Sequence, residues 1–574
     1  MEFIQKMSAL QFSKIADIFS QLEEVTSGNE MRRILSGFFK KVPSSDIDKV
    51  AYFILGKIDA DYMHTETGLA EKMILRAIAI ESKKDSEEIT RIFKKTGDIG
   101  LTAEQAVKTK GKPLSVADVF DGLHKIAKET GAGSQERKTT ILSNLLSHST
   151  PKEAKYIARI ALGTLRLGVA AMTLLDSLSI TFTGTKANKH KLEHAYNICS
   201  DIGLVAKTIA SKGLKGIEKI PIHVGVPIRM MLTQRVKSLK QMEEKMPGSK
   251  AAEEKYDGER IQAHKTPDGK ITLFSRRLDD ISSQFPDIIK ALQSSIKAKT
   301  FVIEGEAIPV DKKGHPLPFQ VLMQRRRKYD VEEYIKKIPV RLYLFELLYL
   351  DGKTYLHEDY PARHKALEKI VKKSNEIQIA GRIITDKLED IEDFFNESLD
   401  KGYEGIIAKS CAKDSVYKAG TRGWLWIKWK KDYMKKLKDT FDLVVVGAFA
   451  GKGKRAGNYG ALLCAVYNKE KDQFETFTKL GTGFTDKVLA QLPKRLAKYR
   501  LLHKPARLEI KKEIKPDFFF EPGLVLEVLG AEITKSPIHS AGLALRFPRF
   551  IRFRDDKSPE QATTTKEIKK IGGK

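Results

Sequence analysis

The spacing of apolar residues changes twice along the chain, and this restricts the fold more than any other feature. Up to about residue 218, apolar residues recur at helical intervals, as over 10–22. From about 222 to 432, short apolar runs of strand length alternate with helical stretches. After about 439, strand patterns dominate. The sequence therefore predicts a multidomain α+β protein with three domains: a helical domain at 1–218, a mixed α/β domain at 222–432, and a small β-barrel at 439–574.

Strand-length apolar runs mark the two later regions. Those of the middle region are 271–275, 301–308, 340–350 and 405–409. In the last region the runs 441–449 and 461–467 flank a glycine-rich stretch, which predicts a long hairpin. Further strands are expected at 525–528 and 550–554.

The charge of the chain predicts a polyanionic partner. The 102 Lys and Arg residues exceed the 74 Asp and Glu residues, which leaves a net charge of +28. Nucleic acid is the simplest partner for such an excess. The alternative is a solvated surface like that of a thermophilic protein, but such surfaces usually balance Lys with Glu. Three cysteines far apart in the sequence exclude a disulfide scaffold and a four-cysteine zinc module, and they fit a reducing compartment.

No targeting or membrane segment is predicted. The first residues lack the basic stretch of a signal peptide. The most apolar stretch, 157–180, is interrupted by Arg159, Arg166 and Asp176, so it reads as a buried helix and not as a span of about 20 apolar residues. We expect an intracellular protein that does not enter a membrane.

The sharpest local signal is the run Glu253-Glu254-Lys255-Tyr256-Asp257-Gly258-Glu259-Arg260. A lysine of ordinary pKa near ~10.4 is a poor nucleophile at neutral pH, and it must lose its proton to act in covalent catalysis. Nearby cations, such as Arg260 and a metal ion, would favour the neutral amine. Gly258 allows the backbone to turn so that Arg260 can point to the same pocket. The alternative is a surface turn after a strand.

Five further stretches follow this run in a fixed order. They are Glu304-Gly305-Glu306, Tyr343-Leu344-Phe345-Glu346, Glu404-Gly405-Ile406-Ile407-Ala408-Lys409, Trp426-Ile427-Lys428-Trp429-Lys430 and Arg546-Phe547-Pro548-Arg549. In this order the motifs closely resemble those of the ATP-dependent DNA ligases of the covalent nucleotidyltransferase superfamily, in their archaeal and eukaryotic replicative type. The last region adds similar stretches at 441–448, 451–457 and 479–484. The resemblance implies a helical DNA-binding domain, an adenylation (nucleotidyltransferase) domain and a C-terminal OB-fold barrel.

The resemblance also implies a reaction. The enzyme would seal nicks between a 5′-phosphate and a 3′-hydroxyl in duplex DNA, in replication, repair and recombination. Lys255 would take AMP from ATP, AMP would pass to the 5′-phosphate, and the 3′-hydroxyl would then displace AMP. The implied cofactors are ATP and Mg²⁺.

Residue roles follow from the same motifs. Glu253 would accept a hydrogen bond from the adenine amino group, and Phe345 would stack on adenine, although plain core packing is the alternative for Phe345. The implied ribose and phosphate contacts are Arg260, Arg276, Lys409, Lys428, Lys430, Arg546 and Arg549. Glu306 and Glu404 would hold Mg²⁺, with Glu306 also at the nucleotide, unless they are strand-end acids paired with lysines. Glu304 stands where the family often has Asp.

DNA contacts are expected in two places. In the helical region, small residues precede Arg137 and Lys138 at a predicted helix start, where backbone N–H groups suit phosphate, and Arg166 lies in a second such stretch. In the barrel, the resemblance places Lys452, Lys454 and Arg455 on DNA. The basic segment 432–438 would act as a hinge that lets the barrel swing between steps.

Two alternatives stay open on the sequence. One is an RNA ligase or a capping-type guanylyltransferase, which the long helical region and Glu253 disfavour. The other is a catalytically inactive scaffold that binds nucleic acid. Ligases of this type often bind a sliding clamp, but the stretch 101–116 lacks the paired aromatic residues of a clamp motif. We expect a monomer in the cytoplasm, associated with the nucleoid, in preference to a nuclear protein.

Overall fold

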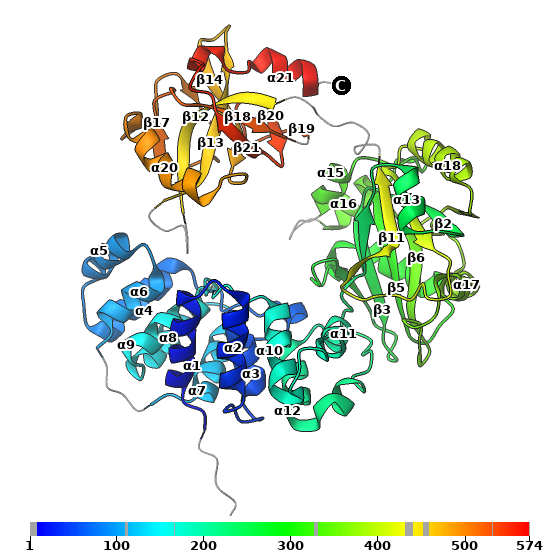
Figure 1. Cartoon of the computed structure of the whole chain (residues 1–574), viewed down its shortest axis with the longest axis horizontal. Coiled ribbons are helices and arrows are strands. Elements are labelled where there is room, and N and C mark those ends of the chain that lie inside the picture. The colour runs from blue at the N-terminus through cyan, green and yellow to red at the C-terminus, as the bar shows by residue number, and fades with distance from the viewer. Residues whose placement is uncertain are drawn as a thin grey trace, which may run out of the picture. The chain divides into compact units, whose positions relative to one another are not determined.

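The computed structural model describes residues 9–108, 113–165, 167–325, 331–430, 440–451, 458–530 and 532–572. The chain forms two compact units, which meet in sequence at Met434 and Lys435. The first unit holds the helical region and the mixed α/β region, apart from a stretch of five residues, and the second holds the β-rich region (Figure 1). The predicted three-region architecture is thus confirmed.

The first region is built from helices alone among its described residues. They are α1 (Phe12–Glu24), α2 (Gly28–Phe39), α3 (Ile47–Ile54), η1 (Asp61–Met63), α4 (Glu71–Ser82), α5 (Ser86–Thr96), α6 (Ile99–Ala106), α7 (Val116–Lys128), α8 (Ser134–Ser147), α9 (Pro151–Ala161), α10 (Ala171–Thr183), α11 (Lys189–Cys199) and α12 (Ile202–Ile217). Capping boxes at Ser115 and Thr150 set the starts of α7 and α9. The apolar faces of these helices meet in one core.

The prediction of a single buried helix over 157–180 is wrong. The stretch forms the end of α9 and most of α10, with a connection between them. Gly163 and Gly168 in this connection have φ values of +69° and +76°, a backbone conformation that interrupts a right-handed helix. Arg166, a predicted DNA contact, lies in the same connection and outside the described residues.

The middle region contains two sheets. The first has the strand order β1 (Leu232–Arg235), β11 (Arg422–Lys430), β10 (Gly405–Ser410), β2 (Lys250–Lys255) and β9 (Arg382–Thr385). Its strands are antiparallel except for the β1–β11 pair. Ala252, Ile406, Ala408 and Trp429 on one face pack against α13 (Leu239–Lys245) and α18 (Leu388–Asp400).

The second sheet has the order β4 (Ile271–Ser275), β3 (Glu259–Lys265), β5 (Phe301–Pro309), β6 (Val340–Leu350) and β7 (Lys353–Thr354), and β8 (Ile377–Ile379) pairs with β6. The sheet packs against α14 (Pro286–Ser295) and α17 (Tyr360–Ile370). Shorter elements are η2 (Ser282–Gln284), α15 (Phe319–Leu322), η3 (Met323–Arg325) and α16 (Val331–Lys337). The predicted strands at 271–275, 301–308, 340–350 and 405–409 are confirmed within a residue.

The two sheets meet through a shared apolar cluster. Val302 and Leu348 of the second sheet pack with Trp426 of the first, and the half-buried Phe345 lies at the edge of this cluster. The other face of each sheet is covered by helices, so the two inner faces border the site described below.

The second unit is β-rich, and its main sheet bends around an apolar core. Its elements are β12 (Thr440–Ala450), β13 (Tyr459–Asn468), β14 (Gln473–Leu480), α20 (Asp486–Ala497), β15 (Arg500–Leu501), β16 (Leu508–Glu509), β17 (Phe518–Phe520), β18 (Val525–Leu529), β19 (Glu532–Lys535), β20 (Leu543–Arg546), β21 (Arg549–Phe553), η5 (Pro559–Gln561) and α21 (Thr565–Gly572). The predicted hairpin is confirmed, since β12 and β13 pair antiparallel. None of the helices in the described parts of the chain is both long and apolar enough to span a membrane.

Candidate active site

The register of three neighbouring strands gathers the chemistry-bearing residues on one sheet face. Gly405 of β10 lies opposite both Lys255 of β2 and Lys430 of β11. Because side chains alternate along a strand, every second residue from these points shares the same face. That face carries Glu253 and Lys255, then Ile407 and Lys409, then Trp426, Lys428 and Lys430. The strand register thus brings together motifs that are up to about 175 residues apart in the sequence.

Lys255, Glu404 and Lys430 meet at one end of this face. The Glu404 Oε2 atom lies 2.7 Å from Lys255 Nζ and 2.5 Å from Lys430 Nζ. The Glu404 N–H donates to the Lys255 carbonyl at 2.9 Å, which ties the carboxylate to the lysine backbone. Gly405 allows this junction, since its φ is +141° and a Cβ there would lie 2.3 Å from the Trp429 carbonyl oxygen.

The pKa of Lys255 is raised in the structure, contrary to the expectation that nearby cations favour its neutral form. Burial lowers the pKa, but the carboxylates of Glu404, Glu306 and Asp257 outweigh burial. Arg260 does not supply the expected positive charge, because its guanidinium is paired with Glu304 at 2.7 Å. The nucleophile candidate therefore stays protonated until the surrounding negative charge is neutralised.

Glu306 faces the same junction from β5. Burial raises the pKa of Glu306 to about 7, although Lys255 and Arg260 favour its charged form. Among the described residues, Glu306 has no hydrogen-bond or ion-pair partner. Glu404 differs, because Lys255 and Lys430 outweigh its burial and lower its pKa. Two carboxylates, one of them unpaired, provide the hard oxygen ligands that Mg²⁺ prefers, so the residues fit this ion.

Lys428 lies among cations and has no carboxylate partner in the described parts of the chain. Burial and the charges of Lys430, Lys255, Arg276 and Arg422 lower its pKa to about 8. Arg276, just after β4, and Arg422, at the start of β11, are exposed and also lack an ion-pair partner among the described residues. Such a cluster of unpaired positive charge suits a polyphosphate. Arg422 is a candidate that was not predicted from the sequence, although its even spacing to Lys428 along one strand indicates a common face.

Glu253 is buried on the same face of the first sheet as Lys255, in a cluster of polar groups. Its Oε2 pairs with Lys409 Nζ at 2.7 Å, and its Oε1 accepts from the Tyr360 hydroxyl. Lys409 Nζ also donates to the Phe345 carbonyl at 2.9 Å and lies 4.5 Å from the ring centre of Trp426. Lys409 is thus buried beside Glu253, and its phosphate contact stays a prediction.

The direction of the Phe345 side chain is set by a β-bulge. Glu304 of β5 lies opposite Glu346, whereas the next residue, Gly305, lies opposite Leu344, so Phe345 has no partner. The extra residue reverses the alternation of β6 and re-aims the side chain. The Phe345 ring stays half-buried and meets Trp426 edge-on at 6.3 Å, with the Arg260 guanidinium 5.3 Å from the ring centre. Stacking on a base requires an aromatic ring that stays partly exposed, as Phe345 does.

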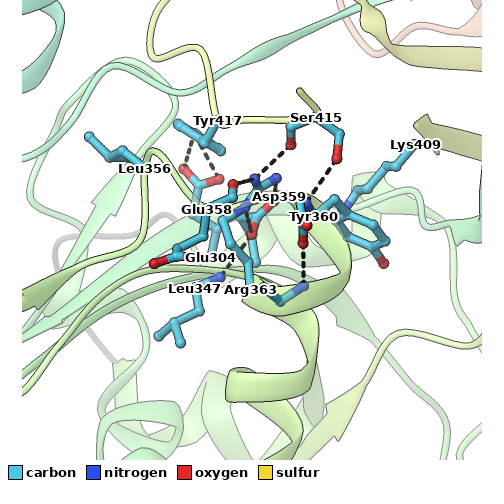
Figure 2. A network of polar contacts seen from close by, with 12 residues as sticks. Glu304, Leu347, Leu356, Glu358, Asp359, Tyr360, Arg363, Lys409, Ser415 and Tyr417 are labelled. Atoms are coloured by element: carbon cyan, nitrogen blue, oxygen red, sulfur yellow. Dashed lines mark hydrogen bonds and ion pairs between the residues drawn. The ribbon is translucent and has the colours of Figure 1, made fainter. Parts of the chain in front are cut away.

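A buried polar network centred on Glu304 fixes the Arg260 guanidinium. Glu304 accepts from Arg260 at 2.7 Å, from Gln262 at 2.9 Å and from the Tyr417 hydroxyl at 3.0 Å. Figure 2 shows Tyr417 directed at the Glu304 carboxylate. Since Glu304 is fully buried and satisfied by three donors, it acts as an anchor for Arg260 and not as a ligand.

Arg546 and Arg549 lie in the second unit, where Arg546 ends β20 and Arg549 begins β21. Both are exposed, and Phe547 between them has φ +51° and is 74% exposed. Arg546 is 3.6 Å from Glu532, and this exposed pair leaves its guanidinium available for another anion.

The predicted DNA contacts are only partly described. Gly133, with φ +74°, precedes α8, so the helix start predicted there is confirmed. Arg137 uses its donors on Glu129 at 2.6 Å and on two loop carbonyls, and Lys138 donates to the Thr67 carbonyl at 2.6 Å. Lys452, Lys454 and Arg455, like the expected hinge at 432–438, lie outside the described residues.

Comparison with protein families yields three matches in chain order. They are the DNA ligase N terminus over residues 11–179, the ATP dependent DNA ligase domain over 230–430 and the ATP dependent DNA ligase C terminal region over 455–557. The second match contains every residue of the Lys255 junction.

Full-length relatives are similar to the chain. DNA ligase 1 of Methanosarcina acetivorans is 46% identical over 576 residues, which covers 98% of this chain and 99% of that protein. The DNA ligase of Caldivirga maquilingensis is 44% identical over 589 residues, covering 98% and 97%. A solved structure named Pmar-Lig_PreS3 has a TM-score of 0.57 at 19% identity and covers 94% of this chain and 99% of that chain, which supports the fold alone.

Proposed function

Because the chain belongs to the ATP-dependent DNA ligases, we propose that Lys255 is the residue that carries AMP during the sealing of nicked duplex DNA. The main support is the junction of Lys255 with Glu404 and Glu306, bordered by the unpaired cation cluster at Lys428. The family assignment favours this reading over the RNA-joining and capping alternatives and over an inactive scaffold.

The reaction then has three displacements at phosphorus. Lys255 Nζ attacks the α-phosphate of ATP, a P–N bond forms, and pyrophosphate leaves with the electrons of the broken P–O bond. A 5′-phosphate oxygen of the nick next attacks the AMP phosphorus and releases the lysine. The 3′-hydroxyl finally loses its proton, attacks the 5′-phosphate and releases AMP. Each displacement requires the entering and leaving atoms to be in line.

Lys255 must lose a proton before the first step, and Glu404, Glu306 and Asp257 oppose that loss. A Mg²⁺ ion held by Glu306 and Glu404 would neutralise carboxylate and phosphate charge, which favours the neutral amine. The residues of the chain do the positioning: the Glu404 N–H and carboxylate hold Lys255 at the end of β2.

The nucleotide occupies the space between the sheets in this proposal. Adenine stacks on the open face of Phe345, and its amino group donates to Glu253. The triphosphate lies along Lys428, Arg276 and Arg422, with Lys430 nearby. Arg260, anchored by Glu304, reaches the ribose or the α-phosphate.

Phe345→Ala should raise the ATP concentration that gives half-maximal lysine adenylation by roughly 10- to 100-fold. A base stacked on an aromatic ring gains roughly 1–3 kcal/mol, and about 1.4 kcal/mol corresponds to a factor of ten. The measurement is the yield of covalent AMP against ATP concentration. Phe345→Met, which keeps apolar volume without a ring face, should resemble Phe345→Ala. If either variant only loses thermal stability while its ATP requirement stays normal, then Phe345 is a core residue.

The ATP requirement of the wild type should rise with pH above about 8. Burial and neighbouring cations lower the pKa of Lys428 to about 8, so the free site loses this positive charge as the pH rises through that value. The half-maximal ATP concentration should increase by at most about tenfold per pH unit until the pKa of the ATP-bound state is reached. Lys428→Arg, whose side chain stays protonated, should flatten this dependence. An equal slope in the two proteins would exclude Lys428 from the phosphate site.

In the other steps, we propose that the barrel brings Arg546 and Arg549 to the pyrophosphate during adenylation, and that Lys452, Lys454 and Arg455 contact DNA during sealing. Arg137 and Lys138, together with Arg166, stay predicted DNA contacts of the helical region. Sliding-clamp binding, a monomeric state and a cytoplasmic, nucleoid-associated location likewise stay predictions.

A further inference from the structure

The Glu253 carboxylate has a second partner besides Lys409, the Tyr360 hydroxyl. Only 2% of the residue is exposed, and each carboxylate oxygen has its own donor: Lys409 Nζ for Oε2 and the Tyr360 hydroxyl for Oε1. Each oxygen keeps a second lone pair that a base could reach. The state of this carboxylate therefore decides whether the pocket offers an acceptor or a donor.

Arg382 fixes the direction of the Tyr360 hydroxyl. Arg382 lies opposite Glu253 on the neighbouring strand β9, and its Nη1 donates to the Tyr360 oxygen at 3.2 Å. A guanidinium can only donate, so the hydroxyl proton of Tyr360 must point away from Arg382. The only acceptor that the hydroxyl contacts among the described residues is Glu253, which therefore accepts this hydrogen bond.

The Tyr360 backbone is held in place by hydrogen bonds at the start of α17. Tyr360 opens α17, and its N–H donates to Ser415 Oγ at 3.0 Å. Arg363 in turn donates to the Ser415 carbonyl at 2.8 Å and to both oxygens of the fully buried Glu346, at 2.8 and 3.0 Å. Figure 2 shows Ser415 between Arg363 and Tyr360. The first turn of α17 is thus clamped, so the hydroxyl has a fixed position.

We propose that Tyr360 is a specificity-determining residue, whose hydroxyl keeps Glu253 an ionised acceptor so that the site takes a purine with an amino group at C6 and rejects one with a carbonyl there. The inference rests on the proposed function, in which Glu253 reads the base. A carboxylate opposite a carbonyl leaves two acceptors facing each other, whereas a protonated carboxyl group could donate to that carbonyl.

The groups around Glu253 shift its pKa in opposite directions. Burial raises its pKa, Glu346 raises it further, and Lys409 and Tyr360 lower it. Arg382 on β9 and Cys411, just after β10, also face this pocket. Because the Tyr360 hydroxyl is among the groups that lower the pKa, its loss must shift protonation of Glu253 to higher pH.

The test uses the full-length protein with Mg²⁺ and either ATP or ITP, which carries the C6 carbonyl. Covalent nucleotide on the protein is measured over a range of pH. In Tyr360→Phe, the preference for ATP over ITP should fall by about tenfold or more, since a charge-assisted hydrogen bond is lost. The ITP yield of this variant relative to its ATP yield should rise as the pH falls, with a midpoint at higher pH than in the wild type.

Tyr156→Phe is the matched control. The Tyr156 ring is fully buried, and its hydroxyl donates to Glu23 at 3.1 Å in the helical region. It should lose a similar stabilising contact and keep the wild-type ATP preference. Should Tyr360→Phe fail to fold, Arg382→Ala decides, because it frees the hydroxyl to rotate and should weaken the preference in the same direction.

A folded Tyr360→Phe that forms both adducts with the wild-type preference at every pH would overturn the inference, as would an unchanged preference in Arg382→Ala. A wild-type protein that forms no covalent adduct with ATP would instead contradict the proposed function, and the inference would fall with it. The two failures are therefore distinguishable.

Discussion

Lys255→Ala is expected to abolish the covalent protein–AMP adduct, with a loss of more than about a thousandfold, as for the removal of other catalytic nucleophiles. Lys255 contacts Glu404 and lies within reach of the Glu306 charge. Lys255→Arg should fail as well, because a guanidinium keeps its proton and cannot attack phosphorus. Labelled ATP followed by denaturing electrophoresis measures the adduct.

Lys430→Ala is the informative control for this result. Lys430 contacts the same Glu404 oxygen at 2.5 Å, so its loss disturbs the junction without removing the proposed nucleophile. The adduct should persist in this variant at a lower rate. An adduct of wild-type yield on Lys255→Ala would show that another residue carries AMP.

Arg546→Ala and Arg549→Ala should each slow lysine adenylation by about a hundredfold and do much less harm to the sealing of a nick that already carries a 5′-adenylate. In-line displacement requires the leaving group to be held opposite the attacking amine, and a misplacement of ~1 Å can cost about a hundredfold. Sealing of a pre-adenylated nick releases no pyrophosphate. Both half-reactions are measured on both variants.

Arg552→Ala controls for charge removal on the same strand. Arg552 is exposed on β21 but is paired with Glu527 at 2.6 Å, so it offers less free charge. It should leave both half-reactions near wild type. A parallel loss of adenylation and of pre-adenylated sealing in the Arg546 and Arg549 variants would contradict a barrel that serves the first step separately.

The placement of the motifs on strands could be predicted from the sequence. Apolar runs of strand length carry Glu306, Phe345 and Glu404 on or beside them, and the structure places strands at those runs. The common face of Lys428 and Lys430 also follows from the period of two along one strand. The sequence does not show the register between strands. This register alone places Lys255 on the same sheet face as Lys428 and Lys430.

Three features of the site depend on tertiary context. The bulge that exposes Phe345 is a register shift between β5 and β6, and periodicity alone favours core packing for this residue. Lys409 is buried because its partner Glu253, on the neighbouring strand β2, is also buried. The raised pKa of Lys255 reflects carboxylates from three different segments, which no local motif reveals.

The central claim is that Lys255 carries AMP from ATP to a DNA nick, and a single transfer experiment tests it most directly. The protein is incubated with α-labelled ATP and Mg²⁺, freed of nucleotide, mapped for the labelled residue, and then mixed with nicked duplex DNA. Label is expected on Lys255, from where it should move to the DNA 5′-phosphate and be released as AMP when the nick is sealed. Label on another residue, or label on Lys255 that stays on the protein while nicks are sealed, would contradict it.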